Sequence, residues 1–185
     1  RVLAGDIQRG STTRERAGIL FCDVRGFTAL SEKVGAERVI SVVNQIFQIV
    51  GKHAKPRGGE ILKFIGDAML LTFSDVSSEP ELAVALIETS RAAVKEVDEL
   101  AVSLGLSVAV GFGGHIGEVV RGNIGTEERL DFTVMGPAVN LTARLESLCR
   151  PLGAAAVFSS EVAQYGDLQS GGKVELKGIA EPQPV

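Results

Sequence analysis

The sequence predicts an α+β protein built as a ferredoxin-like sandwich, in which an antiparallel-rich sheet carries two long covering helices. Three observations indicate this class. Short apolar runs of strand length alternate with two long stretches whose apolar residues recur at helical spacing. Two of the apolar runs are separated only by Gly66 and Asp67, which is typical of a β-hairpin. The chain has 185 residues, enough for one domain with its own core.

The first half of the chain supplies a strand, a helix and the hairpin. Residues 1–16 are polar and are expected to form a flexible lead-in, which leaves a single domain over residues 17–185. The dense apolar run 17–22 predicts a buried central strand. Residues 36–53 are expected to form a helix, because one stripe is apolar: Val39, Val42, Val43, Ile46, Phe47 and Val50.

A second long helix is expected over residues 81–104, with Pro80 near its first turn. The strongly apolar run 106–112 predicts another core strand. The glycine-rich stretch 113–117 is expected to break that strand, so that residues 118–124 return as the second arm of a hairpin. His115 stands alone in this expected turn and is interpreted as structural.

The last part of the chain is expected to elaborate the sandwich with a strand, a helix and a closing strand. These cover residues 130–134, 138–148 and 173–179. The burying positions expected in this last helix are Val139, Leu141, Leu145 and Leu148. The two long helices would cover one face of the sheet, and the other face would then meet loops, solvent or a partner.

Composition excludes several classes of function. The formal net charge is −4, and no dense Lys/Arg patch appears, so a nucleic-acid partner is not expected. Cys22 and Cys149 lack metal-ligand spacing, which favours buried free thiols in a reducing, cytoplasmic compartment. No apolar run has membrane-spanning length. The chain opens on Arg1 rather than Met, so we interpret it as part of a larger parent with a possible fused sensor or membrane segment.

Two aspartates occupy similar settings. Asp23 ends the first core strand, and Asp67 lies in the turn of the hairpin. Either could be only a turn residue. Together, however, two partly buried carboxylates would repel each other, and a divalent cation is the usual resolution. Because oxygen-only ligands suit Mg²⁺ or Mn²⁺ rather than zinc, the pair predicts a site for one of these ions.

Two further groups could meet an anion. Gly26, Phe27 and Thr28 follow the first aspartate just before a helix start, where backbone N–H groups could face phosphate oxygens. Asn140 and Arg144 are four residues apart and therefore emerge on one helix face. A solvated face is the alternative reading of that second pair.

Four stretches of the sequence resemble the class III nucleotidyl cyclases, the adenylyl and guanylyl cyclase catalytic domains. They are FCDVRGFTALSE, ILKFIGDAMLLTF, GGHIGEVVRGNIG and LDFTVMGPAVNLTARLESL, and they stand in the order of the family. Together they span nearly the whole chain from Gly18 to Ile179, and four ordered motifs are much more specific than any one of them.

The resemblance implies roles for the candidate residues. Asp23 and Asp67 would hold two divalent ions per site, with the Val24 carbonyl as a further ligand. The triphosphate would lie at Gly26, Phe27 and Thr28, and Lys63 and Thr133 would read the purine base. Asn140 would orient the ribose, and Arg144 would meet the charge that develops on the phosphate.

The base-reading pair favours adenine, and hence ATP as substrate. Threonine at position 133 resembles a subgroup of adenylyl cyclases, some of which respond to bicarbonate, whereas guanylyl cyclases usually carry glutamate and cysteine at these two places. Lys177-Gly178 is followed by Ile179 where the family often has a further phosphate-binding lysine, which puts that contact in doubt.

The resemblance also implies a head-to-tail homodimer whose two sites are shared. One chain would supply the metal ligands of a site, and its twin would supply Lys63, Thr133, Asn140 and Arg144. The expected activity is conversion of ATP to cyclic AMP and pyrophosphate. Three alternatives remain open: a guanylyl or dual-specificity cyclase, a nucleotide-binding regulatory module without turnover, and a ferredoxin-like interaction domain.

Overall fold

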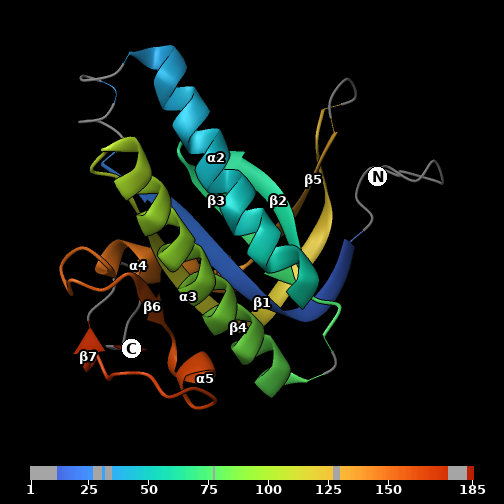
Figure 1. Ribbon diagram of the computed structural model, residues 1–185. Coiled ribbons are helices and arrows are strands. Elements are labelled where there is room, and N and C mark those ends of the chain that lie inside the picture. The colour runs from blue at the N-terminus through green and yellow to red at the C-terminus, as the bar shows by residue number, and fades with distance from the viewer. Residues whose placement is uncertain (1–11, 27–30, 32–34, 77, 127–129, 175–182) are drawn as a thin grey trace.

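The computed structural model describes residues 12–26, 31, 35–76, 78–126, 130–174 and 183–185 (Figure 1). Its main sheet has the strand order β2-β3-β1-β4-β5, with β6 pairing parallel to β4 and every other pair antiparallel. This confirms the predicted α+β class. The strands are β1 (Thr12–Arg25), β2 (Gly59–Ile65), β3 (Ala68–Phe73), β4 (Ala109–Gly125), β5 (Leu130–Met135) and β6 (Ala156–Phe158).

The helices lie on both faces of the sheet. In Figure 1, α2 (Ala36–Ala54) and α3 (Glu79–Leu104) cross in front of the strands, and α4 (Pro137–Leu148) lies behind them. The short elements are η1 (Lys55–Arg57), α5 (Ser160–Ala163) and the two-stranded ribbon of β7 (Lys173–Val174) and β8 (Gln183–Pro184). No helix in the described ranges combines the length and apolarity that a membrane crossing needs.

The core forms because β1 alternates its side chains between the two faces. Leu20, Cys22 and Val24 belong to the cluster under α2 and α3, whereas Ala17 and Ile19 pack on the opposite side with Ala138 of α4. Burial of these apolar side chains is the main force that holds the layers together. The sheet is therefore buried on both faces at its centre.

Helix α2 is the helix that its apolar stripe predicts. It spans Ala36–Ala54, and its buried residues include every predicted position except Phe47. That ring is only partly buried and stacks on Phe64 of β2, with ring centroids 4.9 Å apart. Helix α3 likewise begins at Glu79 with Pro80 in its first turn, and it ends at Gly105, whose φ is 63°.

The hairpin prediction at residues 61–73 is confirmed. Ile65 pairs with Ala68, so Gly66 and Asp67 form the two-residue connection between β2 and β3. Gly66 has a φ of 63°, the left-handed conformation that glycine adopts at little cost. The Gly-Asp pair therefore ends one strand and begins the next at the end of the sheet where β1 also ends.

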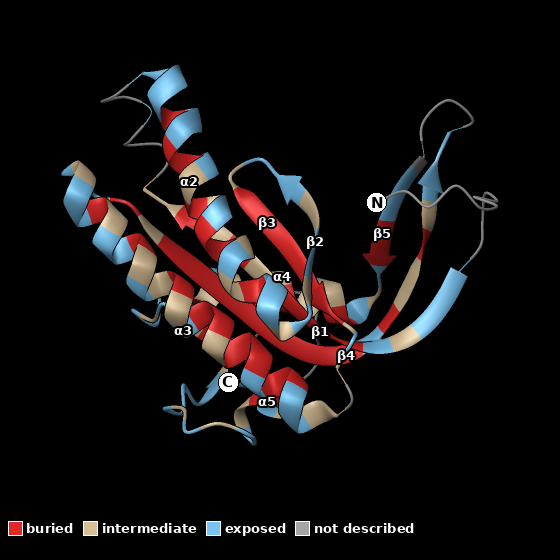
Figure 2. Ribbon diagram, turned by 45° about the vertical axis from the view of Figure 1, so that its right-hand side comes forward, coloured by how far each residue is buried: buried red, intermediate tan, exposed pale blue. Residues whose placement is uncertain are grey.

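The first strand is longer than predicted. β1 begins at Thr12, so residues 12–16, expected in the flexible lead-in, pair with the second half of β4. Figure 2 shows that burial is concentrated in the middle of the sheet and falls toward this end. We call this end the arm: residues 12–16 of β1, residues 118–125 of β4, and β5.

The predicted hairpin at residues 113–117 is wrong, because β4 runs unbroken from Ala109 to Gly125. The glycines serve close packing instead of a turn. A Cβ on Gly113 would lie 2.2 Å from the Thr142 carbonyl oxygen of α4, and one on Gly114 would lie 2.5 Å from the Phe158 ring. Because these glycines have no side chain, the backbone of α4 and the Phe158 ring of β6 pack directly against the strand.

The packing of α4 against β4 corrects two further expectations. The second face of the sheet is not left to loops or a partner alone, since α4 covers part of it. The fully buried residues of α4 are Ala138, Thr142 and Leu145, and of the four predicted positions only Leu145 is among them. Val139, Leu141 and Leu148 are partly buried at the edges of the clusters. Small residues turn inward because the glycines of β4 bring the helix backbone close.

His115 is structural, as interpreted, but it lies within β4 and not in a turn. The side chain is buried, and its Nδ1 lies 2.8 Å from Ser159 Oγ. Burial lowers the pKa of the imidazole, which favours the neutral form. The sequence did not predict strand β6 or helix α5, which follows it in the chain. The closing strand is described only as Lys173–Val174, and the rest of the predicted 173–179 lies outside the described residues.

Both cysteines are free and buried, as predicted. Burial raises the pKa of the Cys22 thiol well above its ordinary value and that of Cys149 to about 11. The Cys149 thiol also donates a hydrogen bond of 3.2 Å to the Phe112 carbonyl.

We expect neither thiol to react with a disulfide reagent in the native protein at pH 8, because the reactive thiolate is scarce and access is blocked. Absorbance of the released thiolate measures this. The native protein should release none within minutes, and the same sample in guanidinium should release two equivalents. Rapid modification of the native protein would contradict the packing around β1 and α4.

Candidate functional site

The two predicted metal-ligand aspartates lie side by side at one end of the sheet. Asp23 of β1 pairs with Ala68 of β3, the residue directly after Asp67. The backbone N–H of Val24 donates a 3.2 Å hydrogen bond to the Asp67 carbonyl, which locks the two segments together. Residues far apart in sequence are thus held together by strand pairing alone.

Electrostatics agree with this proximity. Burial raises the pKa of Asp23 above its ordinary value, and the negative charge of Asp67 raises it further. Arg25 and Arg150 act in the opposite direction but do not cancel the shift. A carboxylate whose ionised form is disfavoured by burial and by a neighbouring carboxylate belongs to the kind of donor set that a divalent cation stabilises.

The donors suit a hard cation that shares its coordination with a substrate. Within the described residues, no three His, Cys, Asp or Glu side chains converge on one point. A cation here would therefore take Asp23, Asp67 and further oxygens from backbone, water or substrate. Val24 buries its side chain in the core, so its backbone is held rigidly beside the pair.

Gly26 begins the segment predicted to meet phosphate. Its φ is +83°, and a Cβ there would lie 2.6 Å from the Ser107 carbonyl oxygen, so both conformation and space require glycine. A cavity of about 540 Å³ adjoins it, between the end of α3 and the start of β4. Phe27 and Thr28 of the predicted site, like Ile179, lie outside the described residues.

The two predicted base-reading residues stand on the outer strands of the five-strand order. Lys63 is half-buried in β2, directly after a register irregularity between Ile61 and Lys63. Thr133 of β5 is buried, and its hydroxyl donates a 3.5 Å hydrogen bond to the Val134 carbonyl. Although β2 and β5 are far apart in strand order, the curved sheet brings the two strands into contact.

Asn140 and Arg144 lie one turn apart in the first half of α4, as their spacing predicts. The helix begins after Gly136, whose φ is 143°. Asn140 is exposed and Arg144 is half-buried. Within the described part of the chain, neither side chain has a hydrogen-bond or ion-pair partner, and Lys63 has none either. Among the described residues, no hydrogen bond or ion pair joins the side chain of Lys63, Thr133, Asn140 or Arg144 to that of Asp23 or Asp67 in the same chain.

Sequence reasoning missed Glu146, a third acid near the pair. Burial raises the pKa of Glu146, and the charge of Asp23 raises it further. Gly111, which pairs with Asp23, leaves room for the Glu146 side chain: a Cβ there would lie 2.4 Å from Glu146 Oε1 and 2.5 Å from Arg25 Nη2. Arg25 also donates a 3.0 Å hydrogen bond to the Ala154 carbonyl. The only sequence signal was a charge on the inward side of a helix.

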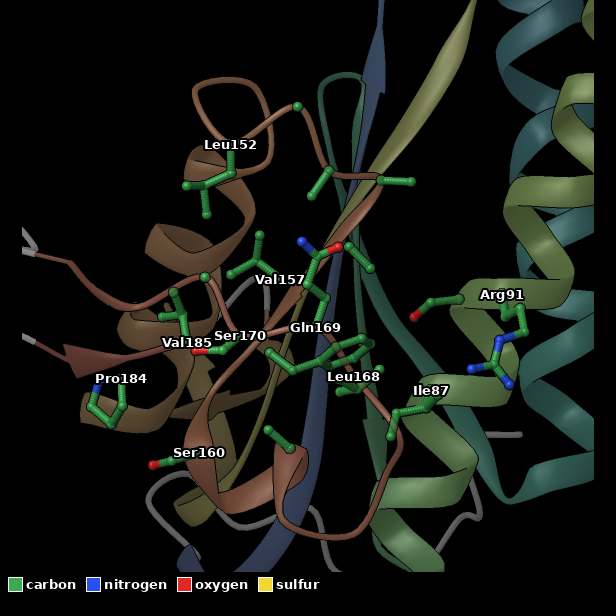
Figure 3. A pocket seen from close by; sticks show the side chains of 18 of the residues that line it. Ile87, Arg91, Leu152, Val157, Ser160, Leu168, Gln169, Ser170, Pro184 and Val185 are labelled. Carbon is green, nitrogen blue, oxygen red and sulfur yellow. The ribbon is translucent and has the colours of Figure 1, made fainter.

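A larger cavity than the one beside Gly26 lies elsewhere. It has a volume of about 860 Å³ and is walled by α3, β6, α5 and the described C-terminal residues (Figure 3). Ile87, Leu168 and Val185 give it a mainly apolar lining. None of the predicted site residues that the structure describes lines it.

Comparison with known proteins finds adenylyl and guanylyl cyclases that resemble this chain. The chain is 34% identical over 163 residues to an adenylate cyclase of Anabaena cylindrica, covering 86% of this chain and 32% of that protein. The crystal structure of the adenylyl cyclase CyaB from P. aeruginosa superposes with a TM-score of 0.82 at 30% identity, covering 94% of this chain and 93% of that one. The guanylyl cyclase Cya2 superposes with a TM-score of 0.75 at 33% identity, covering 93% and 90% of the two chains.

The chain thus spans about a third of the length of the Anabaena relative. The family model described as the adenylate and guanylate cyclase catalytic domain matches residues 10–183, which is nearly the whole sequence. The paired aspartates, the fold and these matches agree, and the chain belongs to the adenylate and guanylate cyclase catalytic domain family.

Proposed function

We propose that this chain is the catalytic domain of an adenylyl cyclase, which converts ATP to 3′,5′-cyclic AMP and pyrophosphate. The observation that carries the proposal is the adjacency of Asp23 and Asp67, with the pKa of Asp23 raised by burial and by the charge of Asp67, in a chain of this family. The similarity to adenylyl cyclases of Anabaena and P. aeruginosa supports it.

The reaction is an intramolecular displacement. The ribose 3′-oxygen forms a bond to the α-phosphorus, its proton is lost, and the bond from the α-phosphorus to the bridging oxygen breaks as pyrophosphate leaves. Asp23, Asp67 and the Val24 carbonyl would hold two Mg²⁺ or Mn²⁺ ions. When bound, such ions lower the pKa of the hydroxyl and neutralise phosphate charge.

The other candidate residues bind and orient the nucleotide. Gly26, with Phe27 and Thr28 after it, would face the triphosphate through backbone N–H groups. Asn140 would orient the ribose, and Arg144 would stabilise charge that develops on the phosphate, an effect typically worth about 10²–10³ in rate. Lys63 and Thr133 would read the base.

We further propose that two copies assemble head to tail and share each site. Lys63, Asn140 and Arg144 lack partners within the described residues of their own chain, although two of them carry charge. Large apolar side chains also stay exposed on β2 and the arm, as expected of a surface that a partner covers. They are Ile61, Phe64, Ile65, Ile124, Phe132 and Met135.

The choice of adenine rests on Lys63 with Thr133, the combination that resembles the threonine-containing adenylyl cyclases, a subgroup in which some members respond to bicarbonate. A guanylyl or dual-specificity cyclase is the second candidate, because the similarity to the guanylyl cyclase Cya2 is of the same order as that to CyaB. The free thiols favour a reducing, cytoplasmic setting, and the parent protein would carry regulatory regions beyond this domain.

Incubation with ATP or GTP and Mn²⁺, followed by chromatography of the products, tests the function. We expect cyclic AMP to predominate, with a specific activity that rises with protein concentration because the site needs two chains. Preference for GTP would favour the guanylyl cyclase. Nucleotide binding without any cyclic product would favour a regulatory module.

Removing the charge of Asp23 should stabilise the metal-free fold. Because the pKa of Asp23 is raised in the folded protein, protonation of this side chain favours the folded state. That stabilisation is fully present below the unfolded pKa and is lost as the pH rises through the folded pKa. At neutral pH the wild type therefore lacks that contribution. We expect Asp23→Asn to raise the Tm in EDTA while abolishing turnover, a trade between stability and function.

Mn²⁺ should raise the Tm of the wild type by mass action and leave that of Asp23→Asn nearly unchanged. The exposed Asp167→Asn is the matched control and should behave like the wild type in both respects. A lower Tm for Asp23→Asn in EDTA, or an equal Mn²⁺ response in all three proteins, would refute the carboxylate pair as a strained cation site.

Complementation tests the shared site. Asp67→Ala and Arg144→Ala chains should each be inactive alone, and mixing them under exchange conditions should restore about one site per mixed dimer. The double variant Asp67→Ala/Arg144→Ala is the control and should rescue neither single variant. If the two single variants remain inactive together while mass measurements show that they exchange, each site belongs to one chain.

A further inference from the structure

Arg121 of β4 is the centre of a polar cluster on the arm. Its side chain is only 16% exposed, and its three guanidinium nitrogens all have partners. Nε donates to Glu15 Oε1 at 2.7 Å, and Nη1 donates to Glu60 Oε2 at 3.1 Å. Nη2 donates to Ser74 Oγ at 2.8 Å and to Thr72 Oγ1 at 3.3 Å.

The same guanidinium lies over the ring of Phe132, with 5.6 Å between its carbon and the ring centroid. The contacts of this one side chain therefore reach β1, β2, β3 with the residue that follows it, and β5. Such a set requires arginine, because a planar fork with five N–H groups can serve separate acceptors and still stack on a ring. Lysine offers three donors from one point and no flat face.

The cluster contacts both of the strands that carry the residues proposed to read the base. In the ladder of β4 with β5, Arg121 pairs with Val134, beside the pairing of Gly122 with Thr133. The ring on which Arg121 stacks belongs to the residue before Thr133. On β2, the carboxylate that it holds belongs to Glu60, three residues before Lys63.

No strand ladder joins these two strands directly. β2 and β5 stand at opposite ends of the order β2-β3-β1-β4-β5, so three strands separate Lys63 from Thr133 along the sheet. The register irregularity between Ile61 and Lys63 loosens β2 just before the lysine. Arg121 bridges both strands with one planar group. Its ion pair with Glu15 is part-buried, whereas its ion pair with Glu60 of β2 is exposed.

We propose that Arg121 is a positioning residue that sets the placement of Thr133 relative to Lys63 and thereby the selectivity for the purine base. This inference rests on the proposed function, in which those two residues contact the base. Arg121 itself touches neither of them and acts through Phe132 and Glu60.

The test compares kcat/KM for ATP and for GTP in Arg121→Met and Arg121→Lys. We expect the ratio of the two values to fall about tenfold in both variants, the size of one displaced polar contact. Lysine should fail to rescue, because it keeps the charge and loses the fork. A purely structural role would lower both values by the same factor and leave their ratio unchanged.

Phe132→Leu provides a variant that keeps every ion pair of the cluster. The residue is 46% exposed, so the fold should tolerate the change, and the base ratio should shift in the same direction. Effects of Phe132→Leu and Arg121→Met should be non-additive in the double variant, because they act on one contact. Arg91→Met, which removes an exposed arginine paired with Glu88, is the matched control and should leave the ratio unchanged.

Failure of this inference is distinguishable from failure of the proposed function. A wild type that makes cyclic product, together with Arg121 and Phe132 variants of unchanged base ratio, would overturn the positioning role alone. Competition of a fluorescent ATP analogue with ATP and with GTP gives the ratio of the two binding constants, a measure of base preference that needs no turnover. A wild type that neither turns over nor binds either nucleotide would overturn both.

Discussion

The site depends on the pairing of β1 with β3. That ladder brings Asp23 against the turn that carries Asp67, and a backbone hydrogen bond from Val24 to Asp67 fixes the junction. The arrangement opposes stability, because burial and like charge both raise the pKa of Asp23. It persists because apolar residues of β1 and β3, such as Leu20 and Leu71, are fully buried beside it and offset the repulsion. The core therefore imposes the unfavourable charge pair that a cation can relieve.

Local signals explain what the sequence could predict. The apolar period of residues 36–53 predicted α2 to within a residue at its end, and the Gly66-Asp67 pair predicted the hairpin. Both signals lie within a few residues of the structure that they specify. The similar settings of Asp23 and Asp67 followed from the same logic, since each acid ends a strand that must lie in the core. The ladder of β1 with β3 that brings them side by side is a long-range contact, which no local signal predicted.

Long-range packing explains what the sequence could not predict. Glycine occurs in turns and also where another backbone approaches, and nothing near residues 113–117 distinguishes the two. Only the position of α4, some thirty residues later, shows that Gly113 makes room for Thr142. Glu146 and Arg121 were missed for the same reason. Their partners, Asp23 for one and Glu15 and Glu60 for the other, are remote in sequence and become neighbours only after the sheet has coiled.

The charges of the domain divide into two kinds. Arg121 and Arg25 are bound to groups of their own chain, as expected of charges that hold elements in place. Lys63 and Arg144 are half-buried and have no such partner within the described residues. A half-buried cation without a counter-charge loses part of its hydration and has no ion pair to compensate for that loss. In the function that we propose, the triphosphate of a nucleotide held between two copies would supply the missing negative charge. In the proposed head-to-tail dimer, the unpaired cations of one copy and the paired aspartates of the other would be complementary halves of one site, balanced when the substrate binds.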